Sequence, residues 1–455
     1  MEYAERLENV AVLGAAGKMG SGIVLLVSQE MADLALKPEN RSKTFVLHAV
    51  DVSHQALLGL VKYLREQVRK SAEKKITTLR SAYADRKDLV DNGEIIDAYV
   101  DHVLDVVRPA TLLAAAAEAN VVFEAAPEDL ALKLKLLACA SGDGSKTPWV
   151  FTNTSSIPIH EIDEKARLGG RIMGFHFYNP PAVQKLVELI RGKTTLPEVA
   201  KFAEALTKSL RKTVVPSNDV AGFIGNGHFM RDMLHGISEA ERLGKEMPFP
   251  HAVYCVNKVS QDFLVRPMGV FQLADYVGLD VCQCILNVMD PRLPGQDLKS
   301  PLIDRLLGQG VKGGQNHDGS QKDGFLHYDA GRPAGVYDPD AGRYAPLSEF
   351  QAECDKKLGP LPEPALPWKA AVKHPSREKA LEEFFGKLEN MTTLGAQLWR
   401  RYGRRSKEIG LKLVSDGVAA SPEDVNKVLL TGFFHAYGPV NDYFARTVSP
   451  AKAAT

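Results

Sequence analysis

The sequence has little of what marks a membrane, secreted or nucleic-acid-binding chain. Its 56 Lys and Arg equal its 56 Asp and Glu, so no net charge favours a nucleic-acid partner. The five cysteines are odd in number and lack metal-ligand spacing, which predicts buried or inert thiols, a reducing compartment and no metal site. Apolar runs reach only roughly ten residues, too short for a bilayer, and the polar N-terminus is no signal peptide. We expect a cytoplasmic protein with no membrane partner.

The composition is that of an ordinary globular protein with more than one domain. Hydrophobic residues make up 45% and charged residues 25% of the chain. A length of 455 residues exceeds what one ordinary hydrophobic core organises, which predicts two or three domains.

A glycine turn follows the first predicted strand. Residues 9–13, NVAVL, predict a buried parallel strand, and GAAGKMGSGIVLLV continues as a turn and a helix. Gly14, Gly17 and Gly20 would let the backbone approach a pyrophosphate at the helix N-terminus. The spacing G-x-x-G-x-x-G is one residue longer than the common fingerprint, so a plain tight turn is the alternative.

The second predicted strand lies within residues 44–53, TFVLHAVDVS, and its apolar part ends at Asp51. An acidic residue there accepts hydrogen bonds from the adenosine ribose and repels a 2′-phosphate, which favours NAD over NADP. Asp51 lies further from the glycines than the usual twenty or so residues, and the polar stretch KPENRSKT is expected to be an inserted surface loop. The alternative role for Asp51 is a strand-end cap.

Further candidate ligand residues follow on a basic helix and on two strand–loop units. The helix predicts either a solvated face or a site for the phosphates of an extended anion; its basic residues are Lys62, Arg65, Arg69, Lys70, Lys74 and Lys75. The stretches NVVFEAAPEDLALK and PWVFTNTSSIPI place Glu128, Lys133, Asn153 and Ser155 after predicted strands. Ligands bind at these strand ends in an open parallel sheet.

The stretch GFHFYNPPAVQKLVELI, residues 174–190, carries a candidate catalytic pair. His176 lies near the end of one predicted strand and Glu188 on the next. The ordinary pKa of histidine suits general acid–base catalysis near neutral pH, and a carboxylate on its other nitrogen would fix the tautomer. Beside a nicotinamide, such a pair suits oxidation of a secondary alcohol. The alternative is a core histidine between aromatic residues.

Together these segments resemble the L-3-hydroxyacyl-CoA dehydrogenase family. The matching stretches between about residues 9 and 330 are GKMGSGI, FEAAPEDLALK, TNTSSIPI, GFHFYNPPAVQKLVELI, DVAGFIGN, RPMGVFQLADYVGLD and KDGFLHY. The resemblance implies a Rossmann-like, doubly wound α/β domain over residues 1–216. It also implies all-helical domains of the 6-phosphogluconate-dehydrogenase C-terminal type, at residues 217–345 and, with a linker, 346–455. No enoyl-CoA hydratase region is expected.

The resemblance also implies a role for each candidate residue. His176 would be the catalytic base and Glu188 its partner, while Ser155 and Asn226 would contact the substrate. Lys74 would face the CoA part of the substrate. The implied NAD-binding residues are Gly14, Gly17, Lys18, Met19, Gly20, Asp51, Glu128, Lys133, Asn153, Ser155 and Asn179.

The chain departs from the family pattern at two points and extends beyond its core. Ala15 stands where the family has its first glycine, and Gly227 follows Asn226 where the family has arginine. Residues 331–368, rich in Pro and Gly, predict a linker. The stretch EIGLKLVSDGVAASPEDVNKVLLTGFFHAYGP resembles a divergent second copy of residues 236–269, with Ser421 as a helix N-cap. The family packs such copies within one chain, much as its single-copy members form homodimers.

The activity implied by the resemblance is NAD-dependent oxidation of (S)-3-hydroxyacyl-CoA to 3-oxoacyl-CoA, as in fatty acid β-oxidation or a related route. Two alternatives remain. The first is a dehydrogenase of a sugar acid such as L-gulonate. A basic CoA-facing helix argues against it, because such a substrate contains no CoA. The second is a non-catalytic NAD-binding subunit, against which the complete set of His176, Glu188, Ser155 and Asn226 argues.

Overall fold

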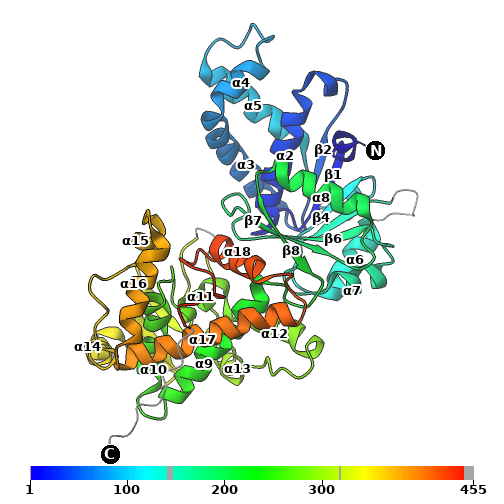
Figure 1. Ribbon diagram of the computed structural model, residues 1–455. Helices are drawn as coiled ribbons and strands as arrows, with labels where there is room; N and C mark the ends of the chain where they lie inside the picture. Colours follow the sequence, from blue (N-terminus) through cyan, green and yellow to red (C-terminus); the bar gives the residue numbers. More distant parts are fainter. Residues whose placement is uncertain (1, 141–146, 317–318, 445–455) are drawn as a thin grey trace, which may run out of the picture. The chain divides into compact units, whose positions relative to one another are not determined.

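Residues 1–220 build an eight-stranded sheet with its helices, and residues 221–455 form a second, mostly helical unit (Figure 1). The computed structural model describes residues 2–140, 147–316 and 319–444. Residues 445–455, assigned above to the second helical domain, lie outside the described part. Within that part, no helix is both long and apolar enough to cross a membrane.

Short aliphatic segments form the sheet because strands covered on both faces need apolar side chains throughout. The strand order is β3-β2-β1-β4-β5-β6-β7-β8. Strands β1 to β6 run parallel, β7 pairs antiparallel with β6, and β8 runs parallel to β7. The strands are β1 (Asn9–Leu13), β2 (Val46–Val50), β3 (Val107–Ala110), β4 (Val121–Glu124), β5 (Trp149–Thr152), β6 (Ile172–Phe177), β7 (Leu186–Arg191) and β8 (Thr213–Asn218).

Helices join these strands and bury their apolar faces against the sheet. Buried residues of α2, α3, α5 and α8 share one hydrophobic core with the strands, while α6 and α7 pack beside each other (Figure 1). The helices of this unit are α1 (Tyr3–Arg6), α2 (Gly20–Ala35), α3 (His54–Lys74), α4 (Ile76–Ala82), α5 (Asn92–Val106), α6 (Leu130–Ala140), α7 (Ile159–Ala166) and α8 (Pro197–Ser209). Short 3₁₀ turns lie at Pro38–Asn40 and Leu113–Ala116. The expected Rossmann-like unit is thus confirmed.

The second unit is built largely from helices, as expected. They are α9 (Gly225–Leu243), α10 (Phe249–Lys258), α11 (Val270–Val277), α12 (Leu279–Met289), α13 (Pro301–Gly308), α14 (Leu347–Leu358), α15 (Trp368–Lys373), α16 (Arg377–Glu389), α17 (Leu394–Ser415) and α18 (Pro422–Gly432). A π-helical turn, Val259–Phe263, follows α10, and a 3₁₀ turn, Asp290–Arg292, follows α12. The predicted N-cap is confirmed, since the Ser421 hydroxyl accepts a hydrogen bond from the Asp424 N–H at 3.2 Å.

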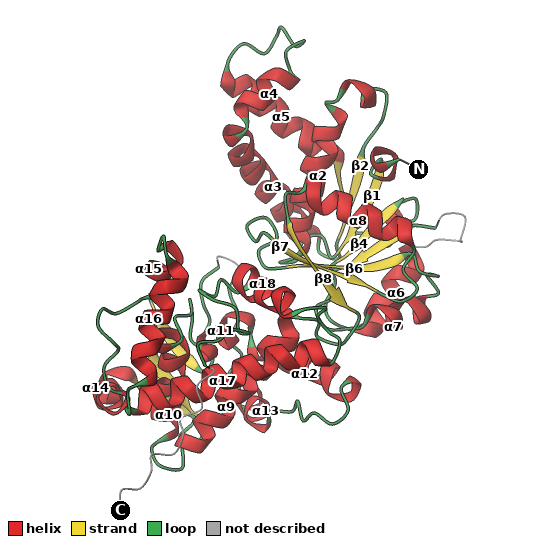
Figure 2. Cartoon of the chain, in the orientation of Figure 1, coloured by secondary structure: helices red, strands yellow, loops and turns green. Residues whose placement is uncertain are grey.

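The prediction that residues 331–368 form a linker is wrong over most of its length. They contain β10 (Arg332–Asp338), β11 (Arg343–Pro346) and α14, and β10 lies between β9 (Leu326–Asp329) and β11 in a small antiparallel sheet (Figure 2). β10 contains Pro333 and Gly335, β11 ends at Pro346, and both strands are short, so only their tertiary pairing reveals them. Residues 359–367 alone connect α14 to α15 without regular structure.

Helices α9 and α17 pack against each other through polar contacts, most of which are buried. The Arg266 guanidinium pairs with Asp232 of α9 at 2.7 Å and donates to the Ser406 hydroxyl of α17 at 3.0 Å. The Tyr402 hydroxyl of α17 donates to the Asp232 carbonyl oxygen at 2.8 Å. Arg401 pairs with Glu239 at 2.6 Å. The C-terminal helices are therefore part of the core of the second unit.

Candidate active site

The glycine turn connects β1 to α2 at the carboxyl edge of the sheet. Gly14 adopts a positive φ of 76°, and a Cβ there would lie 2.7 Å from the Ala125 carbonyl oxygen. A Cβ on Gly20 would lie 2.0 Å from the Gly14 carbonyl oxygen. Both positions therefore require glycine. Gly17, Lys18 and Met19 complete the turn, and α2 begins directly after it at Gly20, so the helix N-terminus lies at the turn.

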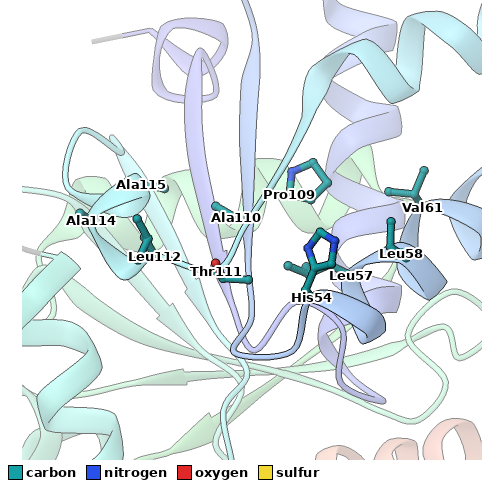
Figure 3. Close-up of a pocket in the computed structure, with 10 residues that line it drawn as sticks. All are labelled: His54, Leu57, Leu58, Val61, Pro109, Ala110, Thr111, Leu112, Ala114 and Ala115. Atoms are coloured by element: carbon teal, nitrogen blue, oxygen red, sulfur yellow. The ribbon is translucent and has the colours of Figure 1, made fainter.

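Asp51 directly follows β2 and contacts the same turn. Its carboxylate accepts a hydrogen bond from the Ala16 N–H at 3.0 Å. Beside it lies a hollow of about 470 Å³ between the first turns of α3 and the end of β3. Leu57, Leu58 and Val61 line one side of this hollow (Figure 3). The other side is formed by residues 109–112, 114 and 115, so the wall next to Asp51 is mainly apolar.

Glu128 organises the loop that carries Ser155. One oxygen, Oε1, accepts hydrogen bonds from the Ser155 N–H at 3.0 Å, the Ser156 N–H at 2.9 Å and the hydroxyls of Thr154 and Ser156 at 2.7 Å. Burial alone would raise the pKa of Glu128, but the charge of Lys133 and these donors outweigh it, so the pKa lies below its ordinary value. Glu128 is therefore a charged acceptor that fixes this loop.

Lys133 is only 1% exposed and lies between two glutamates. Its Nζ is 2.9 Å from Glu124 Oε1 and 3.5 Å from Glu128 Oε2, and it also donates to the Ala126 carbonyl oxygen. Burial alone would lower the pKa of Lys133, but the two carboxylates outweigh this and raise it. The ammonium is charged and buried inside the domain. Its contacts there are to Glu124, Glu128 and the Ala126 carbonyl oxygen.

His176 and Glu188 face each other across the antiparallel pair of β6 and β7. They are directly opposite residues in this register, and His176 Nδ1 lies 3.3 Å from Glu188 Oε1. Glu188 is fully buried and His176 is 7% exposed. The Tyr178 hydroxyl donates to the same Oε1 at 2.6 Å. Burial and the Glu188 charge raise the pKa of Tyr178 well above its ordinary value, so Tyr178 remains a donor.

Tyr178 is a residue that the sequence reasoning missed. In extended chain, side chains two residues apart lie on one face, so Tyr178 had to lie on the same side as His176. No such sequence pattern indicated that Lys133 points inward and pairs with Glu124.

Further contacts join the candidate residues within the first unit. The side-chain oxygen of Asn153 accepts a hydrogen bond from the Phe177 N–H at 2.9 Å, which joins the end of β5 to the end of β6. Asn179 forms a cis peptide with Pro180 just after β6. Lys74 is exposed at the last residue of α3, and Asn226 is the second residue of α9 in the second unit.

Comparison with known proteins shows what these features belong to. The NAD-binding-domain model of 3-hydroxyacyl-CoA dehydrogenase matches residues 9–220, and the C-terminal-domain model matches residues 252–323. A protein of Bacillus subtilis named probable 3-hydroxybutyryl-CoA dehydrogenase is 31% identical over 309 residues, or 68% of this chain and 94% of that protein. This chain belongs to the 3-hydroxyacyl-CoA dehydrogenase family. It therefore has the NAD-binding domain of an NAD-dependent oxidoreductase.

Two further relatives extend the comparison. A Caenorhabditis elegans protein named probable 3-hydroxyacyl-CoA dehydrogenase is 28% identical over 320 residues, covering 70% of this chain and 93% of that protein. The crystal structure of 3-hydroxybutyryl-CoA dehydrogenase from Escherichia coli K12 aligns with 95% of this chain and 90% of its own, with a TM-score of 0.61 and 23% identity. This second likeness shows a shared fold that includes the C-terminal helices.

Proposed function

We propose that this member of the 3-hydroxyacyl-CoA dehydrogenase family oxidises (S)-3-hydroxyacyl-CoA to 3-oxoacyl-CoA, in fatty acid β-oxidation or a related acyl-CoA degradation route. The observation that carries the proposal is the His176–Glu188 pair. The Nδ1 contact of 3.3 Å to a buried carboxylate directs the other ring nitrogen, Nε2, to act as the proton acceptor.

In the proposed step, His176 takes the proton of the C3 hydroxyl as the C3–H bond breaks. NAD supplies the acceptor for the hydride, and the two electrons of the C3–H bond leave with it. The imidazolium that forms is stabilised by the charge of Glu188, and Tyr178 holds this carboxylate in place through its 2.6 Å hydrogen bond. The product is a β-keto thioester.

The first unit also offers groups suited to each part of NAD. The glycine turn of Gly14, Gly17 and Gly20 would accommodate the pyrophosphate, with Lys18 and Met19 in the same turn. Asp51 would accept hydrogen bonds from the adenosine ribose, and the apolar hollow of about 470 Å³ beside it suits a flat adenine ring.

The nicotinamide end would lie near the loop after β5. Asn153 and Ser155 follow the end of β5, and Asn179 follows the end of β6, the neighbouring strand that carries His176. Glu128 and Lys133 would act on NAD mainly through this loop, because their observed contacts are to protein groups.

The charge on α3 favours a CoA thioester over a sugar acid. Arg65 and Arg69 pair with Asp101 and Asp97 of α5. Lys74 is exposed, and among the described residues no carboxylate forms an ion pair with it. A CoA substrate carries phosphates that such a residue can bind, whereas a small sugar acid does not extend so far.

We also propose that the second unit contains two copies of one helical domain. The tetrapeptide VNKV occurs at residues 256–259 and again at 425–428. Asn257 Oδ1 accepts a hydrogen bond from the N–H of Phe271, fourteen residues later, and Asn426 Oδ1 accepts one from Val440 at the same separation. A Cβ on Gly269 or on Gly438 would meet the respective asparagine side chain within 2.5 Å.

This repeat supports packing of the second copy on the first within one chain, through α9 and α17. Removal of residues 370–455 would expose the buried face of α9. We expect an aggregating or dimerising protein, measurable by light scattering. A monodisperse truncated monomer of unchanged stability would contradict the proposed duplication.

The activity is tested by NADH oxidation with acetoacetyl-CoA, with free acetoacetate as the matched substrate lacking CoA. Turnover of the thioester alone is expected. Turnover of the free acid with equal efficiency would favour the sugar-acid alternative, and NADH binding without turnover of either would favour a non-catalytic subunit.

A further inference from the structure

We propose that the second unit binds an organic phosphate in a pocket between α9 and α17, with Arg231 as the buried charge that recognises it. The pocket has a volume of about 520 Å³ and lies between these two helices and the loop at residues 295–298. Residues of both proposed helical copies line it. The inference is independent of the proposed reaction, since no residue assigned to that reaction lines the pocket.

Arg231 is a buried cation that no carboxylate of the described residues contacts directly. Its side chain is 7% exposed, its Nε donates to Gln296 Oε1 at 2.9 Å, and its Nη1 donates to the Gly227 carbonyl oxygen. Among the described residues, no carboxylate forms an ion pair with it within 4.0 Å. Burial lowers the pKa of Arg231. The charge of Asp416 offsets part of this effect, but Asp416 contacts Gln296 and not Arg231 itself. A buried cation without a direct carboxylate contact is costly, and a bound anion would supply that contact.

Helix α17 carries an excess of positive charge, and two of its basic residues lie at this pocket. Its sequence, LGAQLWRRYGRRSKEIGLKLVS, has six basic residues and one acidic residue. Arg405 and Lys412 of this helix line the pocket, as does His235 of α9. His235 Nε2 is buried, and among the described residues it has no hydrogen-bond partner. Arg231, Arg405 and Lys412 thus bring three cationic side chains to one pocket.

The acidic residues at the pocket do not neutralise these donors firmly. Glu408 pairs with Arg405 at 3.1 Å, and Asp416 pairs with Lys412 at 2.9 Å. Both pairs join residues on one helix surface or at its end, and exposed pairs of this kind contribute little. The remaining acid in the lining, Asp297, forms no ion pair among the described residues. Arg405 and Lys412 can therefore turn toward a ligand.

The size and lining of the pocket indicate an organic phosphate. A planar guanidinium binds a phosphate group through two parallel hydrogen bonds, which a lysine cannot do. A volume of about 520 Å³ exceeds the space of one phosphate group, and Leu234 and Ile409 form apolar parts of the wall. These parts would contact the organic portion of a phosphate monoester.

Calorimetric titration of the full-length protein tests this site, with adenosine 5′-monophosphate and inorganic phosphate as the probes. Saturating NADH is present so that cofactor phosphate sites are filled. We expect saturable binding of the monoester, weakened by about tenfold or more in Arg405→Gln and in Lys412→Gln, since each removes a charge-assisted contact. Arg343→Gln, an exposed arginine on β11, is the matched control and should bind as wild type.

Arg231→Gln should abolish binding, and the two surface variants carry the test if this buried variant does not fold. No saturable binding at millimolar monoester would overturn the proposal. So would wild-type affinity in both surface variants. Equal affinity for inorganic phosphate would assign the pocket to free phosphate and overturn the organic ligand.

Discussion

Replacing Glu188 by Gln should slow hydride transfer by about two decades without weakening NADH binding. The substitution keeps the size of the side chain and an oxygen for the Tyr178 hydroxyl, but it removes the charge that faces His176. Two unit charges 3.3 Å apart interact by about 5 kcal/mol at an effective dielectric constant of about 20. The dipole of the glutamine amide retains part of this interaction energy with His176. A remaining loss of about 3 kcal/mol corresponds to roughly two decades in rate.

The assay is single-turnover oxidation of NADH by acetoacetyl-CoA in a stopped-flow instrument, beside a fluorescence titration of NADH. Glu204→Gln, an exposed glutamate on α8, removes the same charge away from the candidate site and is the matched control. A Glu188→Gln rate within a factor of a few of wild type would refute the role of the pair. Loss of NADH binding together with the rate would show that the fold, and not the proton transfer, had changed.

Three other perturbations test separate parts of the account. Asp51→Ala should raise the efficiency with NADP relative to NAD, because the carboxylate that repels a 2′-phosphate is gone; an unchanged ratio of kcat/KM values would contradict its ribose role. Lys133→Met leaves the buried Glu124 and the partly buried Glu128 without their cation and should lower the free energy of unfolding in urea by about 3–5 kcal/mol; near-wild-type stability would disprove the buried network. Burial lowers the pKa of His228 to about 4 from 6.5, so between these values the unfolded state binds more protons and stability falls as pH falls. His228→Gln should flatten this slope by about 1.4 kcal/mol per pH unit, and an equal slope in the variant would count against it.

The sequence predicted the parts of the fold that local pattern controls. The strand, glycine turn and helix around Gly14 follow from apolar runs and from positions that only glycine tolerates. The pairing of His176 with Glu188 followed from two strands joined by a short proline-containing turn, which brings residues at this separation opposite each other.

The features that the sequence did not reveal depend on tertiary contacts. In the sheet of β9, β10 and β11, the strands β10 and β11 are short and contain Pro or Gly, so their composition is that of a linker until the strands pair. Lys133 was assigned to cofactor binding, but whether a lysine points outward or into an ion pair with Glu124 depends on how α6 packs. The pocket at Arg231 needs α9 and α17 together, residues far apart in the chain.

The most direct test of the proposed catalytic role is the single-turnover rate of His176→Ala with NADH and acetoacetyl-CoA, measured beside its NADH affinity. We expect a rate lower by about two or more decades, in line with loss of a general acid–base group, with NADH affinity unchanged. A rate near that of wild type would show that another group moves the proton and would contradict the assignment of His176.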